Sequence, residues 1–274
     1  MRVAVDARKR AVQLPDRVGR VVSLVPSLTE WLVAAGVGER LVGVTDWCVE
    51  PAEVTARLPK VRGTKNPNLD AVVALDPDLV VANAEENRRV DVERLEAAGV
   101  AVFVTMPTTV AGAVAELRAL AAAVGGLPRA AGVDAELTAA LAGAYRAGRV
   151  PGAGAPVRYA CAVWRDPWMW VGRRTYAADL LALAGGAPVF DDPATRYPKA
   201  DPAAIAASGP RVVLLPSEPY AFGPTDAAEV AARTGATARL VDGQALTWYG
   251  PRIPAALAAF RGLFDEVRAT RSAP

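Results

Sequence analysis

Short β-branched runs alternate with helical patterns along the first hundred residues. Each run predicts a buried strand, and the apolar spacing between the runs predicts helices that cover a sheet. The expected strands are 21–25, 41–44, 79–82 and 100–104, and the expected helices are 27–35, 69–75 and 88–98. Ser27 and Glu30 have the spacing of a capping box, which predicts that the first helix begins there. This alternation indicates a parallel sheet with helices on its faces.

The pattern changes after residue 108. From 109 to 149 it predicts helix, broken only at Gly125-Gly126-Leu127-Pro128, where Pro128 suits the first turn of a second helix. Alternation then resumes, with expected strands at 157–163, 212–215 and 238–241 and expected helices at 176–184, 226–233 and 254–269. We therefore expect an N-terminal α/β lobe over 1–108, a connecting backbone helix over 109–150 and a C-terminal α/β lobe over 151–274.

Composition narrows the class of protein. Hydrophobic residues make up 52% of the 274 positions and charged residues 22%, which excludes an intrinsically disordered chain. Because no run of about 18 apolar residues occurs, we expect a soluble globular protein. The formal net charge of +2 gives no argument for nucleic-acid binding.

Two scarcities exclude common site chemistries. The chain has no His, and Cys48 and Cys161 are its two Cys residues. Zinc, copper and non-haem iron sites usually need imidazole or several thiolates, and most general-base catalysis uses His. We therefore expect no such metal site, no required cofactor and no His-based catalyst, and we assign neither Cys a role.

The first residues carry charges throughout and lack the apolar core of a secretory signal, and no Cys follows that could carry a lipid. The chain as given is therefore expected in the cytoplasm, or outside it if a leader has been removed.

Large aromatic residues follow several of the expected strands. Open α/β sheets bind ligands at the carboxyl ends of their strands, and rigid aromatic faces suit a large flat ligand. The alternative is that these rings cap the core. The expected ligand contacts are Trp47, Trp168, Trp170, Tyr197, Trp248 and Tyr249. Alternation places Trp168 and Trp170 on one side of their segment and Met169 on the other, and we expect the Trp side to face the ligand.

Glu86 and Asn87 follow the third expected strand, so they also become candidate ligand contacts. The alternative is a solvated helix start with acids near the positive end of the helix dipole.

Several segments carry a family likeness, and they occur in the family's order. They are RVVSLVPSLTE (20–30), GVTDW (43–47), NLDAVVALDPDLVVA (68–82), LEAAGVAVFV (95–104), WRDPWMWVG (164–172) and GPR (250–252). Over about residues 18–268 the chain resembles the helical-backbone substrate-binding proteins of ABC importers for cobalamin, siderophores and haem, and most closely the cobalamin-binding branch. The resemblance implies two Rossmann-like lobes with parallel sheets joined by one long backbone helix, as in class III periplasmic binding proteins. It also implies a monomer that holds a corrinoid or metal-chelate-like ligand in the cleft between the lobes and catalyses nothing.

The resemblance also implies roles for individual residues. Trp47 and Tyr197 fall where the family has cleft aromatics, and Asp70 matches an acid that docks onto the permease. The second docking acid falls near Ala203, where this chain has no carboxylate. Thr64 and Asn83 replace further cleft aromatics.

A competing hypothesis is a cytoplasmic enzyme or ligand carrier built on the same receptor fold. Its catalytic groups would come from Glu85, Glu86, Arg165, Asp166, Arg173 or Tyr249. No obvious acid–base pair is present among them, so we favour binding without catalysis.

Overall fold

The computed structural model describes residues 1–125, 128–148 and 154–270. The expected helix break at 126–127 and the end of the connecting segment at 149–150 lie outside these residues. The chain divides into two units, which are described separately. Unit 1 comprises Met1–Pro107, Ala111–Thr138 and Tyr249–Pro251, and unit 2 comprises Thr108–Val110, Ala139–Trp248 and Arg252–Pro274. Among the described residues, no helix has the length and hydropathy to cross a membrane.

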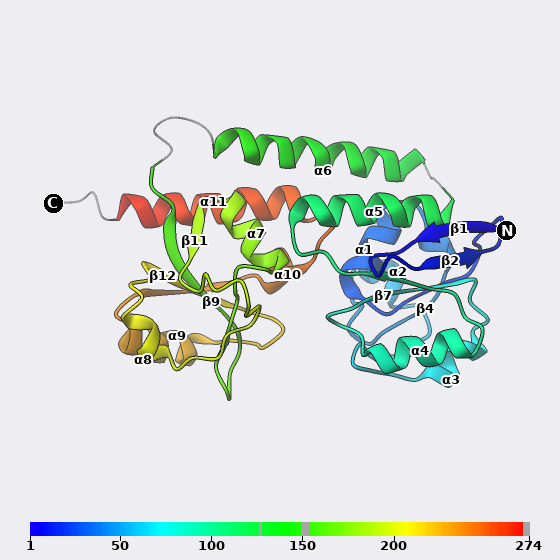
Figure 1. Cartoon of the computed structure of the whole chain (residues 1–274), viewed down its shortest axis with the longest axis horizontal. Coiled ribbons are helices and arrows are strands. Elements are labelled where there is room, and N and C mark those ends of the chain that lie inside the picture. Colours follow the sequence, from blue (N-terminus) through cyan, green and yellow to red (C-terminus); the bar gives the residue numbers. More distant parts are fainter. Residues whose placement is uncertain (126–127, 149–153, 271–274) are drawn as a thin grey trace. The chain divides into compact units, whose positions relative to one another are not determined.

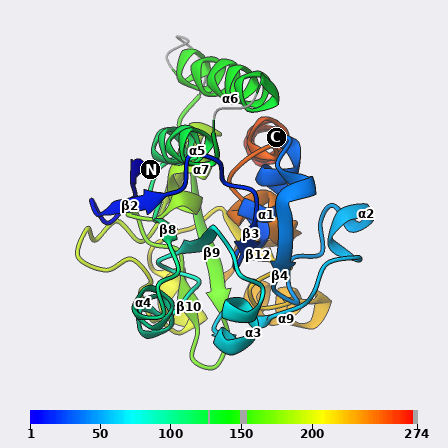
Figure 2. The same ribbon diagram turned by 90° about the vertical axis from the view of Figure 1, so that its right-hand side faces the viewer.

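The sheet of unit 1 contains four parallel strands in the order β4-β3-β7-β8. They are β3 (Val21–Ser23), β4 (Leu41–Val44), β7 (Leu79–Asn83) and β8 (Val102–Thr105). Every residue of β7 and β8 is buried, as expected for parallel strands covered on both faces. Helices α3 (Leu69–Ala74) and α4 (Arg89–Ala97) pack side by side (Figure 1, Figure 2). The expected parallel sheet with covering helices is confirmed.

Helix α1 (Pro26–Ala34) begins before the predicted capping box, so that prediction is wrong. Pro26 occupies the first turn, where its fixed φ favours helix and its missing N–H costs nothing. Val25 is the N-cap and offers no side-chain hydrogen bond. The hydroxyl of Ser27 is buried and has no hydrogen-bond partner in the described part of the chain.

Unit 1 also contains elements that the sequence did not indicate. Strands β1 (Arg2–Val5) and β2 (Ala11–Leu14) form an antiparallel hairpin, and β5 (Arg62–Gly63) pairs with β6 (Asn66–Pro67). Two further short elements are η1 (Gly38–Arg40) and α2 (Ala52–Thr55). The segment expected as the connecting helix contains α5 (Val110–Val124) and α6 (Pro128–Ala147). Helix α6 begins in unit 1 and continues into unit 2.

The sheet of unit 2 is built around β9 (Val157–Trp164), in the order β10-β9-β12-β13. Strands β12 (Val212–Pro216) and β13 (Thr237–Val241) are parallel to β9, as is β11 (Gly186–Pro188). Strand β10 (Met169–Trp170) is antiparallel to β9. The helices of this unit are α7 (Tyr176–Leu183), α8 (Pro202–Ala206), α9 (Pro224–Thr234), α10 (Gly243–Thr247) and α11 (Ile253–Ala269). Units with largely parallel sheets and covering helices match the expected α/β class.

Candidate functional site

Polar side chains gather at the carboxyl edge of the sheet in unit 1. Asn83 and Thr105 end β7 and β8 and lie opposite each other in the ladder. The side-chain Nδ2 of Asn83 donates to Oη of Tyr249 at 2.9 Å, and Oη lies 2.7 Å from the Thr105 hydroxyl. Because that hydroxyl donates its own proton to the carbonyl of Ala82, Tyr249 is the donor to Thr105. The three side chains therefore form a buried and satisfied cluster.

Burial raises the pKa of Tyr249 well above its ordinary value, and the nearby Glu86 acts in the same direction. The phenol is 3% exposed, so it stays protonated at neutral pH. Tyr249 is therefore an anchor for the segment Tyr249–Pro251 within unit 1, rather than a base or a surface aromatic.

The loop after β7 is held by the amide side chains of Asn83 and Asn87. The Oδ1 of Asn83 accepts from the backbone N–H groups of Glu85 at 2.8 Å and Glu86 at 3.2 Å. Asn87 accepts from the N–H of Asn83 through Oδ1, and its Nδ2 donates to the carbonyls of Leu24 and Thr64. Asn87 is 3% exposed. It therefore joins three loops at this edge and is buried, whereas Glu86 is half-buried.

Trp47 follows β4 in unit 1 and is 66% exposed. A Cβ added to Gly63 would lie 3.3 Å from the indole Nε1, so the ring lies against the turn between β5 and β6. That turn is tied to the loop after β7, because Asn87 donates to Thr64 and the ammonium of Lys65 donates to the carbonyl of Glu85. Trp47 thus presents an apolar face on a support fixed by hydrogen bonds.

Cys48 follows Trp47 in the chain but, unlike Trp47, is buried. Its Sγ lies 3.1 Å from the hydroxyl of Thr29 and 3.0 Å from that of Thr45. Burial raises its pKa, and burial likewise raises the pKa of Cys161 in unit 2, so both residues are buried thiols. Within the ranges that the structure describes, no three His, Cys, Asp or Glu side chains are grouped so as to hold a metal ion.

The aromatic residues expected at the ligand in unit 2 belong to its core. Trp170 is fully buried and Trp168 is 8% exposed. Their rings stack at 5.5 Å, and Trp168 stacks on Phe222 at 5.6 Å. The indole of Trp170 donates to the carbonyl of Ala200 at 2.9 Å. The alternation placed both rings on one side as expected, but that side faces the core, so we remove Trp168 and Trp170 from the candidate contacts.

Two further candidates in unit 2 have local partners. Trp248 is 6% exposed, and its Nε1 donates to Oε1 of Glu218 at 2.6 Å while the guanidinium of Arg252 lies 4.9 Å from its ring. Tyr197 is half-buried, with the guanidinium of Arg196 lying 5.8 Å from its ring. Trp248 is therefore a packing residue, whereas Tyr197 keeps part of its surface exposed.

Asp70, the candidate permease contact, is exposed in the first turn of α3. Asn68 caps that helix by accepting from the N–H of Ala71 at 3.1 Å. The position of Asp70 is thus fixed by a capped helix start.

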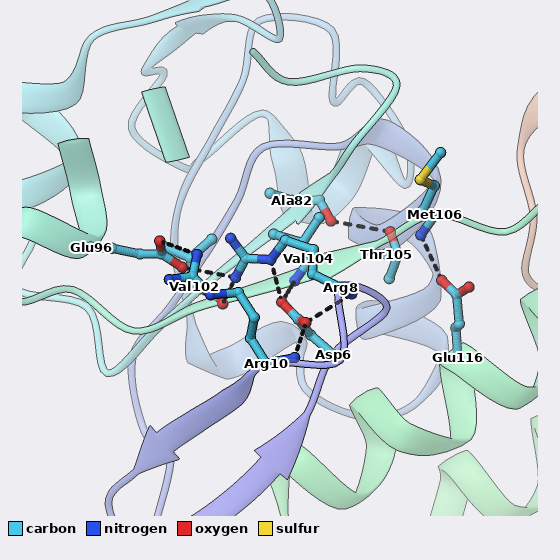
Figure 3. Close-up of polar contacts among 10 residues, drawn as sticks. All are labelled: Asp6, Arg8, Arg10, Ala82, Glu96, Val102, Val104, Thr105, Met106 and Glu116. Carbon is cyan, nitrogen blue, oxygen red and sulfur yellow. Dashed lines mark hydrogen bonds and ion pairs between the residues drawn. The ribbon is translucent and has the colours of Figure 1, made fainter. Parts of the chain in front are cut away.

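A second polar cluster in unit 1 surrounds Asp6 (Figure 3). The Asp6 carboxylate accepts from Nε of Arg8 at 2.7 Å and from the N–H groups of Arg8, Arg10 and Val104. Arg8 and Arg10 in turn pair with Glu96 at 2.8 and 3.1 Å. A pocket of about 300 Å³ lies beside these side chains, but each guanidinium on its wall already has a carboxylate partner. The cluster ties the β1–β2 hairpin to β8.

The sequence-based interpretation missed Asn83 and Thr105 as the residues that organise the edge of the sheet in unit 1. Each is a polar residue at the last position of an otherwise apolar strand, which is the signal that would have identified them. Trp164, the last residue of β9, is 44% exposed.

Comparison with known proteins gives consistent likenesses. A model of the family described as "Periplasmic binding protein" matches residues 21–238. The vitamin B12-binding protein of Vibrio parahaemolyticus serotype O3:K6 is 28% identical over 202 residues, which cover 73% of this chain and 71% of that protein.

Solved structures show the same fold. The periplasmic vitamin B12 binding protein BtuF of Vibrio cholerae has a TM-score of 0.78 at 19% identity, over 92% of this chain and 98% of that one. The periplasmic heme-binding protein RhuT from Roseiflexus sp. RS-1, in apo form, also has a TM-score of 0.78, at 25% identity, over 91% of this chain and 99% of that one. These likenesses confirm the fold class and the family resemblance expected from the sequence.

Proposed function

The chain belongs to the periplasmic binding protein family, and on that premise we propose that it binds a corrinoid reversibly and catalyses no reaction. The observation that carries this proposal is the exposed face of Trp47 at the carboxyl edge of the sheet in unit 1, supported by a hydrogen-bonded turn. A rigid aromatic face buries apolar ligand surface at a small cost in side-chain entropy.

The choice of a corrinoid rests on the relatives and on the surroundings of Trp47. The curated relative from Vibrio parahaemolyticus is named for vitamin B12, whereas RhuT is named for haem. A corrinoid combines an apolar ring with amide groups on its rim. The apolar face of Trp47 fits the ring, and half-buried Thr64 and Glu86 offer polar atoms to the amides.

Three of the groups that the enzyme hypothesis names, Arg165, Asp166 and Tyr249, have partners within the protein. Arg165 pairs with Asp226 and with Glu229, the latter at 2.8 Å, and Asp166 lies 3.8 Å from the same guanidinium. Tyr249 donates to Thr105, and burial raises its pKa. These contacts support binding over the competing enzyme hypothesis.

We propose that the ligand is passed to an ABC permease and that Asp70 contacts it. The exposed carboxylate on a capped helix start supports this role. If the protein passes its ligand to an importer permease, it works outside the cytoplasm. This is the second of the two locations expected from the sequence. Asp70→Lys should weaken binding to a detergent-solubilised corrinoid importer, whereas Glu53→Lys, another exposed acid in a first helical turn, should not. Equal binding by both variants would remove Asp70 from the interface.

The ligand is tested by titrating the protein separately with cyanocobalamin and with hemin while following tryptophan fluorescence. We expect saturable quenching by cyanocobalamin at one ligand per chain. If hemin alone binds saturably, the ligand is haem rather than a corrinoid, and the proposed binding function stands. Turnover of a substrate without binding of either compound would contradict the proposal.

A further inference from the structure

The pocket of about 300 Å³ in unit 1 lies at the edge of a β-hairpin. Its walls are residues 11–13 of β2, residues 99–102 at the start of β8, and the side chains of Arg8, Arg10 and Glu96. Strand β2 pairs with β1 and has no second neighbouring strand among the described residues. Because an edge strand can take a further strand on its unpaired backbone groups, these groups decide what the pocket binds.

The hairpin loop fixes which backbone groups of β2 face away from β1. The N–H of Asp6 donates to the carbonyl of Arg10 at 3.2 Å, and Lys9, with a φ of 62°, donates its N–H to the carbonyl of Asp6. Hydrogen-bonded and non-hydrogen-bonded pairs alternate from this point, so the N–H and C=O groups of Ala11 and Gln13 point away from β1. Both residues are exposed and line the pocket, and neither N–H has an acceptor in the ranges that the structure describes.

The opposite wall of the pocket is closed and fixed. Val102 of β8 is 1% exposed, and its carbonyl accepts from Nη2 of Arg8 at 3.3 Å (Figure 3). The N–H of Val104 donates to the carboxylate of Asp6, and its carbonyl accepts from the N–H of Ala7. The hairpin thus covers the outer edge of β8, and β2 is the edge of the pocket that stays open to a partner.

The hairpin loop also brings an excess of positive charge to the pocket. Arg8, Lys9 and Arg10 follow one another there, and the carboxylates paired with the two arginines are Asp6 and Glu96. The side chain of Arg10 is 59% exposed and donates to Glu96 through Nη1 (Figure 3). Since a guanidinium carries further N–H donors in the same plane, Arg10 can bind a second carboxylate at the mouth of the pocket.

We propose that the edge of β2 binds an extended peptide segment as an added strand, with an acidic side chain opposite Arg10 and an apolar side chain opposite Val12. Main-chain hydrogen bonds to Ala11 and Gln13 hold the peptide, and the side-chain pairs select it. Arg10 and Val12 lie two positions apart and so share one face of the strand. This surface lies at the start of β8, away from Thr105 at its carboxyl end, and it adds a second function to corrinoid binding.

The test uses the heptapeptide acetyl-Thr-Asp-Thr-Val-Thr-Asp-Thr-amide, which places an acid two residues from Val in either strand direction. Titration into the ¹⁵N-labelled full chain should give saturable amide shifts at residues 11–13 and 99–102, and slower hydrogen exchange at Ala11 and Gln13. The same peptide with Asn in place of both Asp residues should bind severalfold more weakly. A version N-methylated at alternate residues, which cannot form the ladder, should not bind.

Variants of the protein separate the backbone contribution from the charge. Ala11→Pro removes an outward N–H from an edge strand, where Pro is tolerated, and should weaken the Asp peptide about tenfold or more. Val3→Pro is the matched control, because Val3 also directs its N–H away from the hairpin pairing, but at the edge of β1, and it should bind normally. Arg10→Gln should lower the affinity of the Asp peptide to that of the Asn peptide.

The outcomes decide the proposal without involving the corrinoid. No saturable binding of the Asp peptide, or equal binding of the N-methylated peptide, would overturn it, and the N-methylated peptide decides even if Ala11→Pro fails to fold. If sedimentation shows that the unaltered protein forms dimers which Ala11→Pro dissociates, the occupant is a second copy and the peptide proposal is wrong. Cyanocobalamin affinity should be the same in all three variants, so a failure of peptide binding leaves the proposed function standing.

Discussion

The phenolic oxygen of Tyr249 lies 2.9 Å from the side-chain nitrogen of Asn83, although the two residues are 166 positions apart in the chain. This contact holds the segment Tyr249–Pro251 in unit 1, while the preceding residue, Trp248, belongs to unit 2 and donates to Glu218. The chain therefore passes from one unit to the other between Trp248 and Tyr249. The indole N–H of Trp248 donates a hydrogen bond, and the phenolic oxygen of Tyr249 accepts one.

Replacing Tyr249 by Phe should destabilise the protein by about 1–2 kcal/mol, because the hydroxyl of Thr105 loses its donor and Asn83 loses an acceptor in a buried site. Asn83 keeps its weaker contact to Thr105 at 3.3 Å, which limits the loss. Urea unfolding measures the change. Tyr145→Phe on α6, where the ring is 47% exposed, is the control and should have no effect. Equal stabilities of the two variants would contradict the anchoring role of Tyr249.

Stability should fall at alkaline pH. Burial raises the pKa of Tyr249, so its folded state holds the phenolic proton more tightly than the unfolded state, whose pKa is about 10. The protonated phenol of Tyr249 therefore stabilises the folded state fully below about pH 10, and this contribution is lost as the pH rises further. Urea midpoints at pH 8 and pH 11 should therefore differ less in Tyr249→Phe than in the unaltered protein. Some loss should remain, since burial also raises the pKa of Tyr159. An identical alkaline loss in both proteins would refute this assignment.

Trp170→Ala should lower the free energy of unfolding by about 3–5 kcal/mol, because it leaves a cavity in the core of unit 2. Trp47→Ala should change it by no more than about 0.5 kcal/mol, because the ring is largely solvated. Thermal melting of the two variants compares them directly. A stable Trp170→Ala protein would mean that the ring is not a core residue and would return it to the candidate contacts.

Asn87→Ala should cost about 2–4 kcal/mol, since it leaves the N–H of Asn83 and the carbonyls of Leu24 and Thr64 without this partner. Arg89→Ala, two residues away with a side chain that is 91% exposed, serves as the control. Chemical unfolding reports both values. If Asn87→Ala were as stable as the control but bound ligand more weakly, Asn87 would be a direct ligand contact after all.

The main strands could be predicted because their signal is local. All five residues of β7 are buried, so the hydrophobic run itself marks the strand. The β1–β2 hairpin was missed because each strand has four residues and charged residues separate them, which leaves too short an alternation to recognise. Helix α1 begins before the capping-box spacing because Pro26 fits the first helical turn, where its missing N–H costs nothing.

The candidate site could be predicted only in part, because burial depends on contacts distant in the chain. Alternation correctly paired Trp168 with Trp170, but nothing in the segment indicates which side is covered by Phe222 and by the residues around Ala200. Tyr249 resembles a surface aromatic until its partners Asn83 and Thr105 are known. Trp47 was predicted as a ligand contact from its place after a strand and from the family resemblance, and its ring is 66% exposed.

Calorimetric titration of cyanocobalamin into the unaltered protein and into Trp47→Ala tests the proposed function most directly. We expect one binding site per chain and a loss of affinity of about tenfold or more in the variant, with an unchanged melting temperature. Val73→Ala, an exposed apolar position on α3, should bind like the unaltered protein. Equal affinities of Trp47→Ala and the unaltered protein, or no binding of cyanocobalamin by either, would contradict the proposal that this exposed indole holds a corrinoid.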